Sequence, residues 1–189
     1  MLNEKQQSEI DKYDRAYKDK HYHIGKLRLK AFEAFLREVS GEVGTLLDVS
    51  TGRGEVLSLA RSLGWIARGT EVVDALLGPD VVYATAWALP FPDRSFNLVS
   101  CLDVMEHLLP EDAEPTVREL GRITKSRLVL TISNKKSKIS GVEYHVNRRP
   151  YPEWDGDIRL WLPDFDVTWK KEYSTDPSEM WTGVRKNEG

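Results

Sequence analysis

The sequence has little cysteine and no long apolar run. Cys101 is the single cysteine in 189 residues, which excludes a disulfide within the chain and a metal cluster built on cysteines. No apolar stretch approaches the roughly 20 residues that cross a bilayer. The first twenty residues are mostly polar and charged, unlike a secretory signal. We therefore expect a cytoplasmic protein without a membrane segment.

Internal repeats, low-complexity tracts and convincing linkers are also absent from the sequence. The composition is 40% hydrophobic and 30% charged, which is typical of a globular protein and excludes a disordered one. A chain of 189 residues is long enough for one full-sized core. We therefore expect a single domain over residues 1–189.

Strand-like and helix-like segments alternate through the middle of the chain. Helical spacing predicts helices at 3–20, 24–39, 54–63, 73–77, 116–123 and 154–162. Short apolar runs predict strands at 46–49, 65–71, 81–84, 96–102 and 128–133. This alternation favours an α/β fold, a parallel sheet with helices on both faces.

The last third of the chain has a different pattern. Residues 165–173 and 179–186 are two further predicted strands, and only a short turn-rich stretch separates them. A parallel crossover needs a dozen or more residues, so these strands should pair as an antiparallel hairpin. The predicted sheet is thus seven-stranded, doubly wound and mostly parallel, with a C-terminal antiparallel hairpin.

A glycine loop follows the first predicted strand. Residues 47–54 read LDVSTGRG, so apolar residues lead through Asp48 into a turn with Gly52 and Gly54 and then into a helix. Glycines let backbone N–H groups approach a ligand closely, and a helix N-terminus adds unpaired donors. The order predicts a site for a nucleotide-like ligand. An ordinary strand-to-helix turn is the alternative interpretation.

Glu71 ends the second predicted strand, 23 residues after Asp48. A carboxylate at this place can accept two hydrogen bonds from the ribose hydroxyls of a nucleoside, and it would repel a 2′-phosphate. The alternative is an exposed strand end without a ligand.

Two later segments follow the third and fourth predicted strands. Residues 85–99 read TAWALPFPDRSFNLV, and residues 101–108 read CLDVMEHL. Together with the glycine loop and Glu71, they resemble the motifs of class I S-adenosylmethionine-dependent methyltransferases of the type-11-like group. The resemblance extends from about residue 13 to residue 185. Ser50 stands where that family has its first glycine, and Thr85 where it has an adenine-contacting aspartate.

The resemblance implies a Rossmann-like fold, methyl transfer, and S-adenosylmethionine as the cofactor. It divides the domain into N-terminal helices (1–40), a cofactor-binding core (41–133), a substrate-side insertion (134–162) and the C-terminal β-hairpin (163–189). It also implies which residues bind the cofactor: Asp48, Ser50, Gly52, Gly54, Glu71, Thr85, Ala86, Leu102 and Asp103.

The insertion contains the candidate general base. Residues 144–154 read YHVNRRPYPEW, and related proteins often carry His-x-Asn here, above the acceptor pocket. The pKa of histidine suits proton removal near neutrality, so His145 is the candidate base. A histidine that ties the loop down is an equal alternative, and a structural cap is the preferred interpretation of His107. His21 and His23 lie two apart without a complete ligand set, so no metal is expected.

The net charge of −3 does not favour general nucleic-acid binding, but residues 122–149 are rich in lysine and arginine. This basic stretch, Lys125 to Arg149, fits either an anionic small substrate or a nucleic acid. The Asn/Asp-Pro-Pro-aromatic motif of amino-methylating DNA enzymes is absent after the fourth predicted strand. We expect methylation of a small-molecule acceptor. A catalytically inactive partner subunit and a nucleic-acid or protein methyltransferase are the alternatives.

Overall fold

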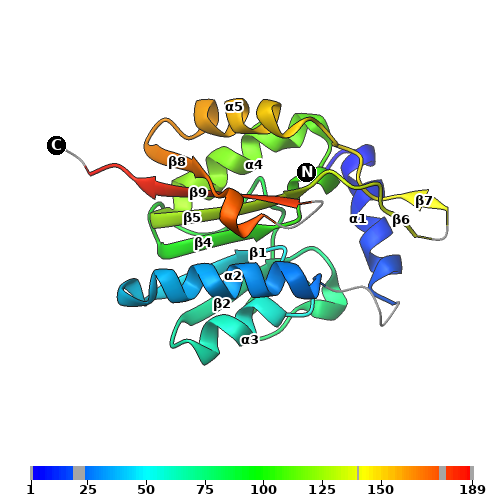
Figure 1. The fold of residues 1–189 in the computed structure, drawn as a ribbon. Helices are drawn as coiled ribbons and strands as arrows, with labels where there is room; N and C mark the ends of the chain where they lie inside the picture. The colour runs from blue at the N-terminus through cyan, green and yellow to red at the C-terminus, as the bar shows by residue number, and fades with distance from the viewer. Residues whose placement is uncertain (1, 19–23, 140, 175–177, 188–189) are drawn as a thin grey trace.

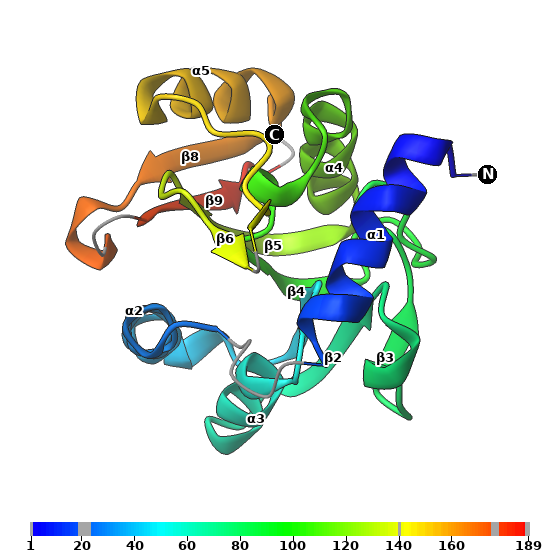
Figure 2. The ribbon, with the colours of Figure 1, turned by 90° about the vertical axis from the view of Figure 1, so that its right-hand side faces the viewer.

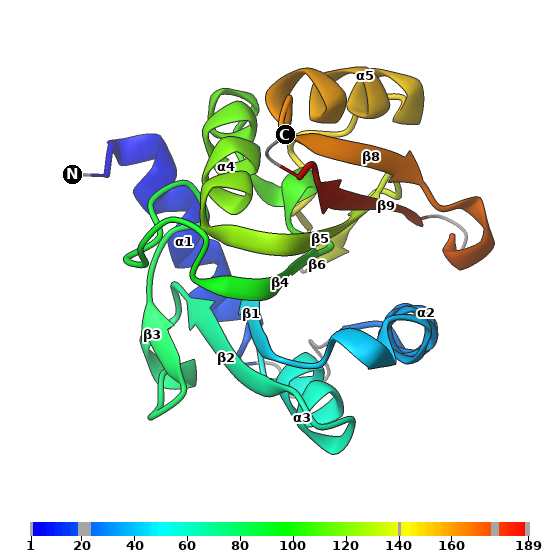
Figure 3. The ribbon, with the colours of Figure 1, turned by 90° about the vertical axis from the view of Figure 1, so that its left-hand side faces the viewer.

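The computed structural model describes residues 2–18, 24–139, 141–174 and 178–187. Seven strands form one sheet in the order β3-β2-β1-β4-β5-β9-β8 (Figures 1 and 3). Their bounds are β1 Thr45–Val49, β2 Ile66–Glu71, β3 Val81–Tyr83, β4 Phe96–Leu102, β5 Thr124–Ser133, β8 Phe165–Trp169 and β9 Ser178–Arg185. The predicted seven-stranded, mostly parallel sheet is confirmed.

The first five strands are parallel. β1 lies at the centre, with β2 on one side and β4 on the other. The order of the strands along the chain therefore reverses between β1 and β4. In open α/β sheets, ligands bind outside the carboxyl ends of the strands at such a reversal. The loops after β1, β2 and β4 meet at this point.

The last two strands are antiparallel, as predicted. β9 lies between β5 and β8, and Leu128 of β5 is opposite Gly183 of β9. The predicted strand from 165 to 173 is too long, because β8 ends at Trp169 and a 3-10 turn, η4 Lys171–Tyr173, follows. The Tyr173 ring packs edge-on against Phe35 and its hydroxyl bonds to Glu38, which draws the chain away from the sheet.

The helices cover both faces of the sheet. α2 (Lys26–Glu38) and α3 (Glu55–Ser62) lie on one face, and α4 (Pro110–Ile123) and α5 (Tyr151–Trp161) lie on the other (Figure 1). Each face has its own apolar core: Phe32, Leu46 and Val129 belong to the first, and Val99, Leu120 and Trp154 to the second. In the described part of the chain, no helix is both long and apolar enough to span a bilayer.

α1 (Glu4–Ala16) belongs to neither layer. It crosses the end of the sheet next to the carboxyl ends of the parallel strands (Figure 2). Asn3 caps it, and the side chains of Asn3 and Gln6 bond reciprocally to each other's backbone N–H groups. α1 is therefore placed to cover the reversal point of the sheet.

Four short elements complete the fold. Three are 3-10 turns, η1 Ser40–Glu42, η2 Asp74–Leu76 and η3 Met105–His107, and the fourth is a small antiparallel pair, β6 Lys138–Ile139 with β7 Val142–Glu143. The pair was not predicted from the sequence. η3 follows β4 directly and brings Glu106 and His107 toward the end of the sheet.

Candidate active site

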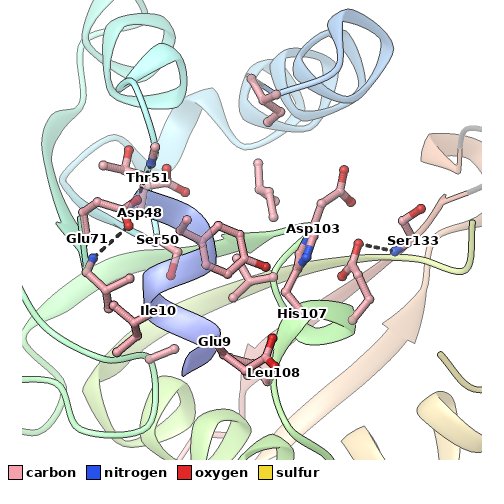
Figure 4. A pocket seen from close by; sticks show the side chains of 18 of the residues that line it. Glu9, Ile10, Asp48, Ser50, Thr51, Glu71, Asp103, His107, Leu108 and Ser133 are labelled. Carbon is pink, nitrogen blue, oxygen red and sulfur yellow. Dashed lines mark hydrogen bonds between the residues drawn. The ribbon is translucent and has the colours of Figure 1, made fainter. Parts of the chain in front are cut away.

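A cavity of about 280 Å³ lies between α1 and the carboxyl ends of the strands. Its wall includes the loops after β1, β2 and β4, part of α1, and His145 from the segment before α5. In Figure 4, Asp48, Ser50 and Glu71 lie on one side of this space, and Asp103, His107 and Ser133 lie on the other. Seven of the nine predicted cofactor residues line it: Asp48, Ser50, Gly52, Glu71, Ala86, Leu102 and Asp103.

The glycine loop has three residues in the left-handed backbone region. Ser50 and Gly52 both have φ +58°, and Gly54 has φ +79°. A Cβ atom at Gly52 would lie 2.6 Å from the Tyr17 hydroxyl, so a side chain there would force the Tyr17 ring to move and would also be strained at this φ. Ser50 has a positive φ, which glycine adopts freely and in which a serine is strained. Gly54 is the N-cap of α3 and lies outside the cavity lining.

Asp48 and Glu71 are buried carboxyl groups in the cavity wall. Burial raises the pKa of Asp48 to about 7, and a 2.6 Å hydrogen bond from the Ser100 hydroxyl opposes this rise. Burial also raises the pKa of Glu71. The two Glu71 oxygens accept backbone N–H bonds from Gly52 at 2.9 Å and from Val72 at 2.8 Å. These bonds fix the carboxylate of Glu71 beside the glycine loop.

The segment after β3 lines the cavity through Ala86 and Trp87. Thr85 is 8% exposed, and it lies outside the cavity lining. Arg122 of α4 holds this segment in place, because its guanidinium donates to the carbonyl oxygens of Leu89 and Phe91 at 3.2 and 2.8 Å. The Leu-Pro-Phe stretch therefore positions Ala86 and Trp87 without lining the cavity itself.

β4 ends at Leu102, and Asp103 begins the turn that follows. Asp103 has φ +54°, and its backbone N–H bonds to the carbonyl of Thr131 at 2.9 Å. Its carboxylate accepts the Thr131 hydroxyl at 2.8 Å and both of its oxygens accept the Nε–H of Arg28. Asp103 thus lies at the cavity wall in a fixed orientation.

Glu106, His107 and His145 come together in the same wall. Each offers one potential ligand atom, and the three atoms lie within 4.8 Å of one another. The His107 and His145 rings are perpendicular, with centroids 4.4 Å apart. Burial lowers the pKa of His107 to about 3 and also lowers the pKa of His145, whereas burial and Asp103 raise the pKa of Glu106 well above its ordinary value.

The predicted role of His145 as a base stays a prediction, and its ring lines the cavity as that role requires. Glu106 was not singled out in the sequence. The signal that could have found it is the Glu-His pair directly after a strand that ends at the site.

The sequence offered Tyr13, Tyr17 and Tyr22 as N-terminal residues that could close over the cofactor, although surface or packing roles were the preferred interpretation. Tyr13 and Tyr17 line the cavity. Arg53 of the glycine loop donates to the Tyr17 carbonyl at 2.8 Å, and its guanidinium lies 5.5 Å from the centre of the Tyr17 ring. These contacts join α1 to the glycine loop. Tyr22, His21 and His23 lie outside the described residues.

The basic stretch is partly neutralised within the fold. Arg127 pairs with Glu42, and Arg149 pairs with Asp157 and stacks 3.7 Å above the Trp154 ring. Lys135, Lys136 and Lys138 are exposed near β6.

The strand order, the glycine loop and the acidic end of β2 define a doubly wound α/β protein with a cavity at its reversal point. Residues 19–168 match a family model described as a methyltransferase domain, and the chain belongs to this family. The predicted resemblance to class I S-adenosylmethionine-dependent methyltransferases is confirmed.

Solved structures share the fold at low sequence identity. The 1,6-didemethyltoxoflavin-N1-methyltransferase of Burkholderia thailandensis has a TM-score of 0.71 and 13% identity, covering 99% of this chain and 92% of its own. The magnesium protoporphyrin IX methyltransferase of Synechocystis PCC 6803 has a TM-score of 0.67 and 19% identity, covering 98% of this chain and 99% of its own.

One curated protein is also similar, sucrose synthase 2 of Hordeum vulgare, at 27% identity over 175 residues. The match covers 86% of this chain and 21% of that protein, so the chain spans about a fifth of its length.

Proposed function

We propose that the cavity binds S-adenosylmethionine and that the protein transfers its methyl group to a small-molecule acceptor. The observation that carries this proposal is the position of Glu71, a buried carboxylate held by two backbone N–H groups beside Gly52. A carboxylate has about four acceptor positions, so Glu71 can still accept a ribose hydroxyl beside its backbone bonds.

The residues of the wall fit the cofactor. Gly52 leaves its space open where a side chain would collide with Tyr17. Four carboxyl groups line the cavity, those of Asp48, Glu71, Asp103 and Glu106, and the ionised ones among them suit the positive charge of a sulfonium. Ala86 and Trp87 offer a backbone N–H and an aromatic surface where an adenine would lie. The wall thus provides separate positions for the ribose, the base and the charged end.

When bound, S-adenosylmethionine would supply a methyl group that is already activated on sulfur. The acceptor lone pair would form the new bond to the methyl carbon, and the electron pair of the broken carbon–sulfur bond would stay on sulfur. The protein's part is to align the acceptor, exclude water and accept a proton where one is released. α1 covers the cavity, and His145 lies in its wall as the candidate proton acceptor. Its lowered pKa keeps the imidazole neutral near pH 7, the form that can take a proton.

The geometry favours a small acceptor over a nucleic acid. The cavity lies beneath α1, and two arginines of the basic stretch, Arg127 and Arg149, are occupied by Glu42 and Asp157. The exposed basic residues of the stretch are Lys125, Lys135, Lys136, Lys138 and Arg148, and three of these lysines lie together near β6. Replacing Lys135, Lys136 and Lys138 by glutamine should leave nucleic-acid binding unchanged at low and at high salt. A salt-dependent loss of binding in this variant would favour a nucleic-acid acceptor.

Calorimetry with S-adenosylhomocysteine tests the cofactor site directly. The unmodified protein should bind one equivalent, and Glu71→Ala should weaken binding by roughly tenfold to a hundredfold, about 1.5–3 kcal/mol for hydrogen bonds to a charged group. Glu114→Gln on the exposed face of α4 is the matched control and should bind normally. Failure of the unmodified protein to bind would overturn the proposal.

A further inference from the structure

We propose that Glu106, His107 and His145 form a binding site for one divalent transition-metal ion in the cavity wall, with zinc as the best match. The three potential ligand atoms lie within 4.8 Å of one another. The binding of the ion rests on these residues alone, whereas its role in the reaction rests on the function proposed above.

The distances suit a site that closes on an ion. Zinc bonds of about 2.1 Å place tetrahedral ligand atoms roughly 3.4 Å apart. The present separations, at most 4.8 Å, therefore have to shorten by no more than about 1.4 Å. The segment that carries His145 is pinned to η3, since the Asn147 N–H bonds to the Glu106 carbonyl at 3.0 Å and its amide bonds to the Met105 carbonyl. The ligands thus come from two segments that are already joined.

Both imidazoles are oriented as metal ligands are. Nδ1 of His107 lies 3.0 Å from the carbonyl oxygen of Tyr144, and Nδ1 of His145 lies 2.6 Å from that of Lys135. A carbonyl oxygen only accepts, so each Nδ1 must carry the proton, and the lone pair is on Nε2. A hydrogen bond of this kind behind the ring is a regular feature of metal-bound histidines.

Glu106 supplies the second, independent observation. Its side chain is fully buried, and Oε1 accepts the Ser133 N–H at 2.8 Å. Its other oxygen, Oε2, has no hydrogen-bond partner among the described residues. A buried carboxylate oxygen without a partner is costly, and a cation at the cluster would satisfy it.

The ligand set indicates the kind of metal. Two imidazole nitrogens and one carboxylate suit zinc and neighbouring first-row ions better than magnesium or calcium. Three protein ligands leave a position open, as catalytic zinc sites do. Here that position faces the cavity lined by Asp103 and His145.

The open position gives the metal a role in the proposed reaction. An acceptor hydroxyl bound there has a lower pKa and loses its proton to solvent more readily, which leaves an oxygen nucleophile beside the methyl donor. The acceptor would then be a hydroxyl compound. In this arrangement His145 holds the ion, and this role replaces the one of proton acceptor that is proposed for it above.

Cobalt(II) titration of chelator-treated protein tests the site, because its absorption bands report imidazole and carboxylate ligands. We expect one equivalent per chain, displaced by zinc, with the affinity reduced by more than about a hundredfold in His145→Gln and in Glu106→Gln. The double variant His21→Gln/His23→Gln controls for binding at the N-terminal histidines and should keep the full signal.

The outcomes separate this inference from the proposed function. If the unmodified protein and His145→Gln bind cobalt equally, or neither binds it, the metal site is overturned. Circular dichroism establishes that Glu106→Gln is folded, and His145→Gln provides a second variant at a less buried position. S-adenosylhomocysteine should still bind His145→Gln, so loss of the metal with retained nucleoside binding supports both conclusions. Absence of nucleoside binding in the unmodified protein would contradict only the proposed function.

Discussion

Arg28 donates its Nε–H to both carboxylate oxygens of Asp103, at 3.0 and 3.1 Å. The arginine side chain is 4% exposed and the aspartate side chain 27%. This pair joins α2 to the turn after β4, across 75 residues of sequence. The pair therefore holds the cavity wall at Asp103 against α2, which lies with α3 on one face of the sheet.

Removing the arginine should destabilise the protein. Arg28→Met leaves Asp103 without its cation in a largely buried position, and breaking such a pair costs roughly 3 kcal/mol. Urea denaturation measures the loss. Arg37→Met is the control, because Arg37 is on the same helix with its side chain 63% exposed, and it should change the free energy of unfolding by less than about 1 kcal/mol. Equal effects of the two substitutions would contradict the role given to the pair.

Ser50→Gly should stabilise the protein. Ser50 has φ +58°, where a serine is strained and a glycine is not. We expect a gain of up to about 1 kcal/mol in the free energy of unfolding, reduced by the extra freedom of glycine in the unfolded chain. Ser58→Gly, at an exposed position inside α3, is the matched control and should cost about 1 kcal/mol. A loss of stability in both variants would show that Ser50 is not strained.

Gly52→Ala should weaken nucleoside binding by more than about tenfold, about 1.4 kcal/mol. The new Cβ would lie 2.6 Å from the Tyr17 hydroxyl and 3.5 Å from the ring carbon that carries it. Tyr17→Phe removes the hydroxyl, so the double variant should recover part of the affinity in calorimetry. If the double variant recovers no affinity, the whole loss comes from the backbone at this position, because alanine is also unfavourable at φ +58°.

Asp48→Asn should flatten the pH dependence of stability. Burial raises the pKa of Asp48 to about 7 from 3.8, so the folded state binds a proton that the unfolded state has lost. The stability that this proton contributes is complete below about pH 4 and is lost as the pH rises to 7. Between pH 5 and pH 8 the free energy of unfolding of the unmodified protein should fall by about 3 kcal/mol more than that of Asp48→Asn. The difference arises over the two pH units from 5 to 7, at about 1.4 kcal/mol for each unit.

Urea denaturation at the two pH values measures this difference. Asp166→Asn, on the exposed side of β8, is the control and should follow the unmodified protein. Parallel curves for Asp48→Asn and the unmodified protein would show that Asp48 ionises normally in the folded state.

The sheet could be predicted from the sequence because its strands are short apolar runs with clear ends. β4 begins and ends at the predicted residues, Phe96 and Leu102. α4 was predicted only from Thr116, but it begins at Pro110. Pro115 cannot donate a helical hydrogen bond, so the sequence suggests that the helix begins after it. The apolar face of α4 packs against the sheet and offsets this missing bond.

The candidate site was predictable where it depends on backbone order and unpredictable where it depends on distant contacts. Asp48, Gly52 and Glu71 lie at strand ends, so the topology alone brings them together. His107 and His145 are 38 residues apart, and nothing in the pattern places their rings 4.4 Å from each other. Thr85 was expected at the cofactor because it occupies the aspartate position of the motif, but it is 8% exposed and lies outside the cavity lining.

The reversed direction of β9 determines where the protein can be attached to a surface or a probe. Ser178 lies beside Ser133 at the cavity end of the sheet, whereas Val184 lies beside Arg127 at the opposite end (Figure 1). The eight residues of β9 span about 25 Å at roughly 3.3 Å each. A tether attached at the Val184 end of β9 therefore leaves the mouth of the cavity clear for binding measurements.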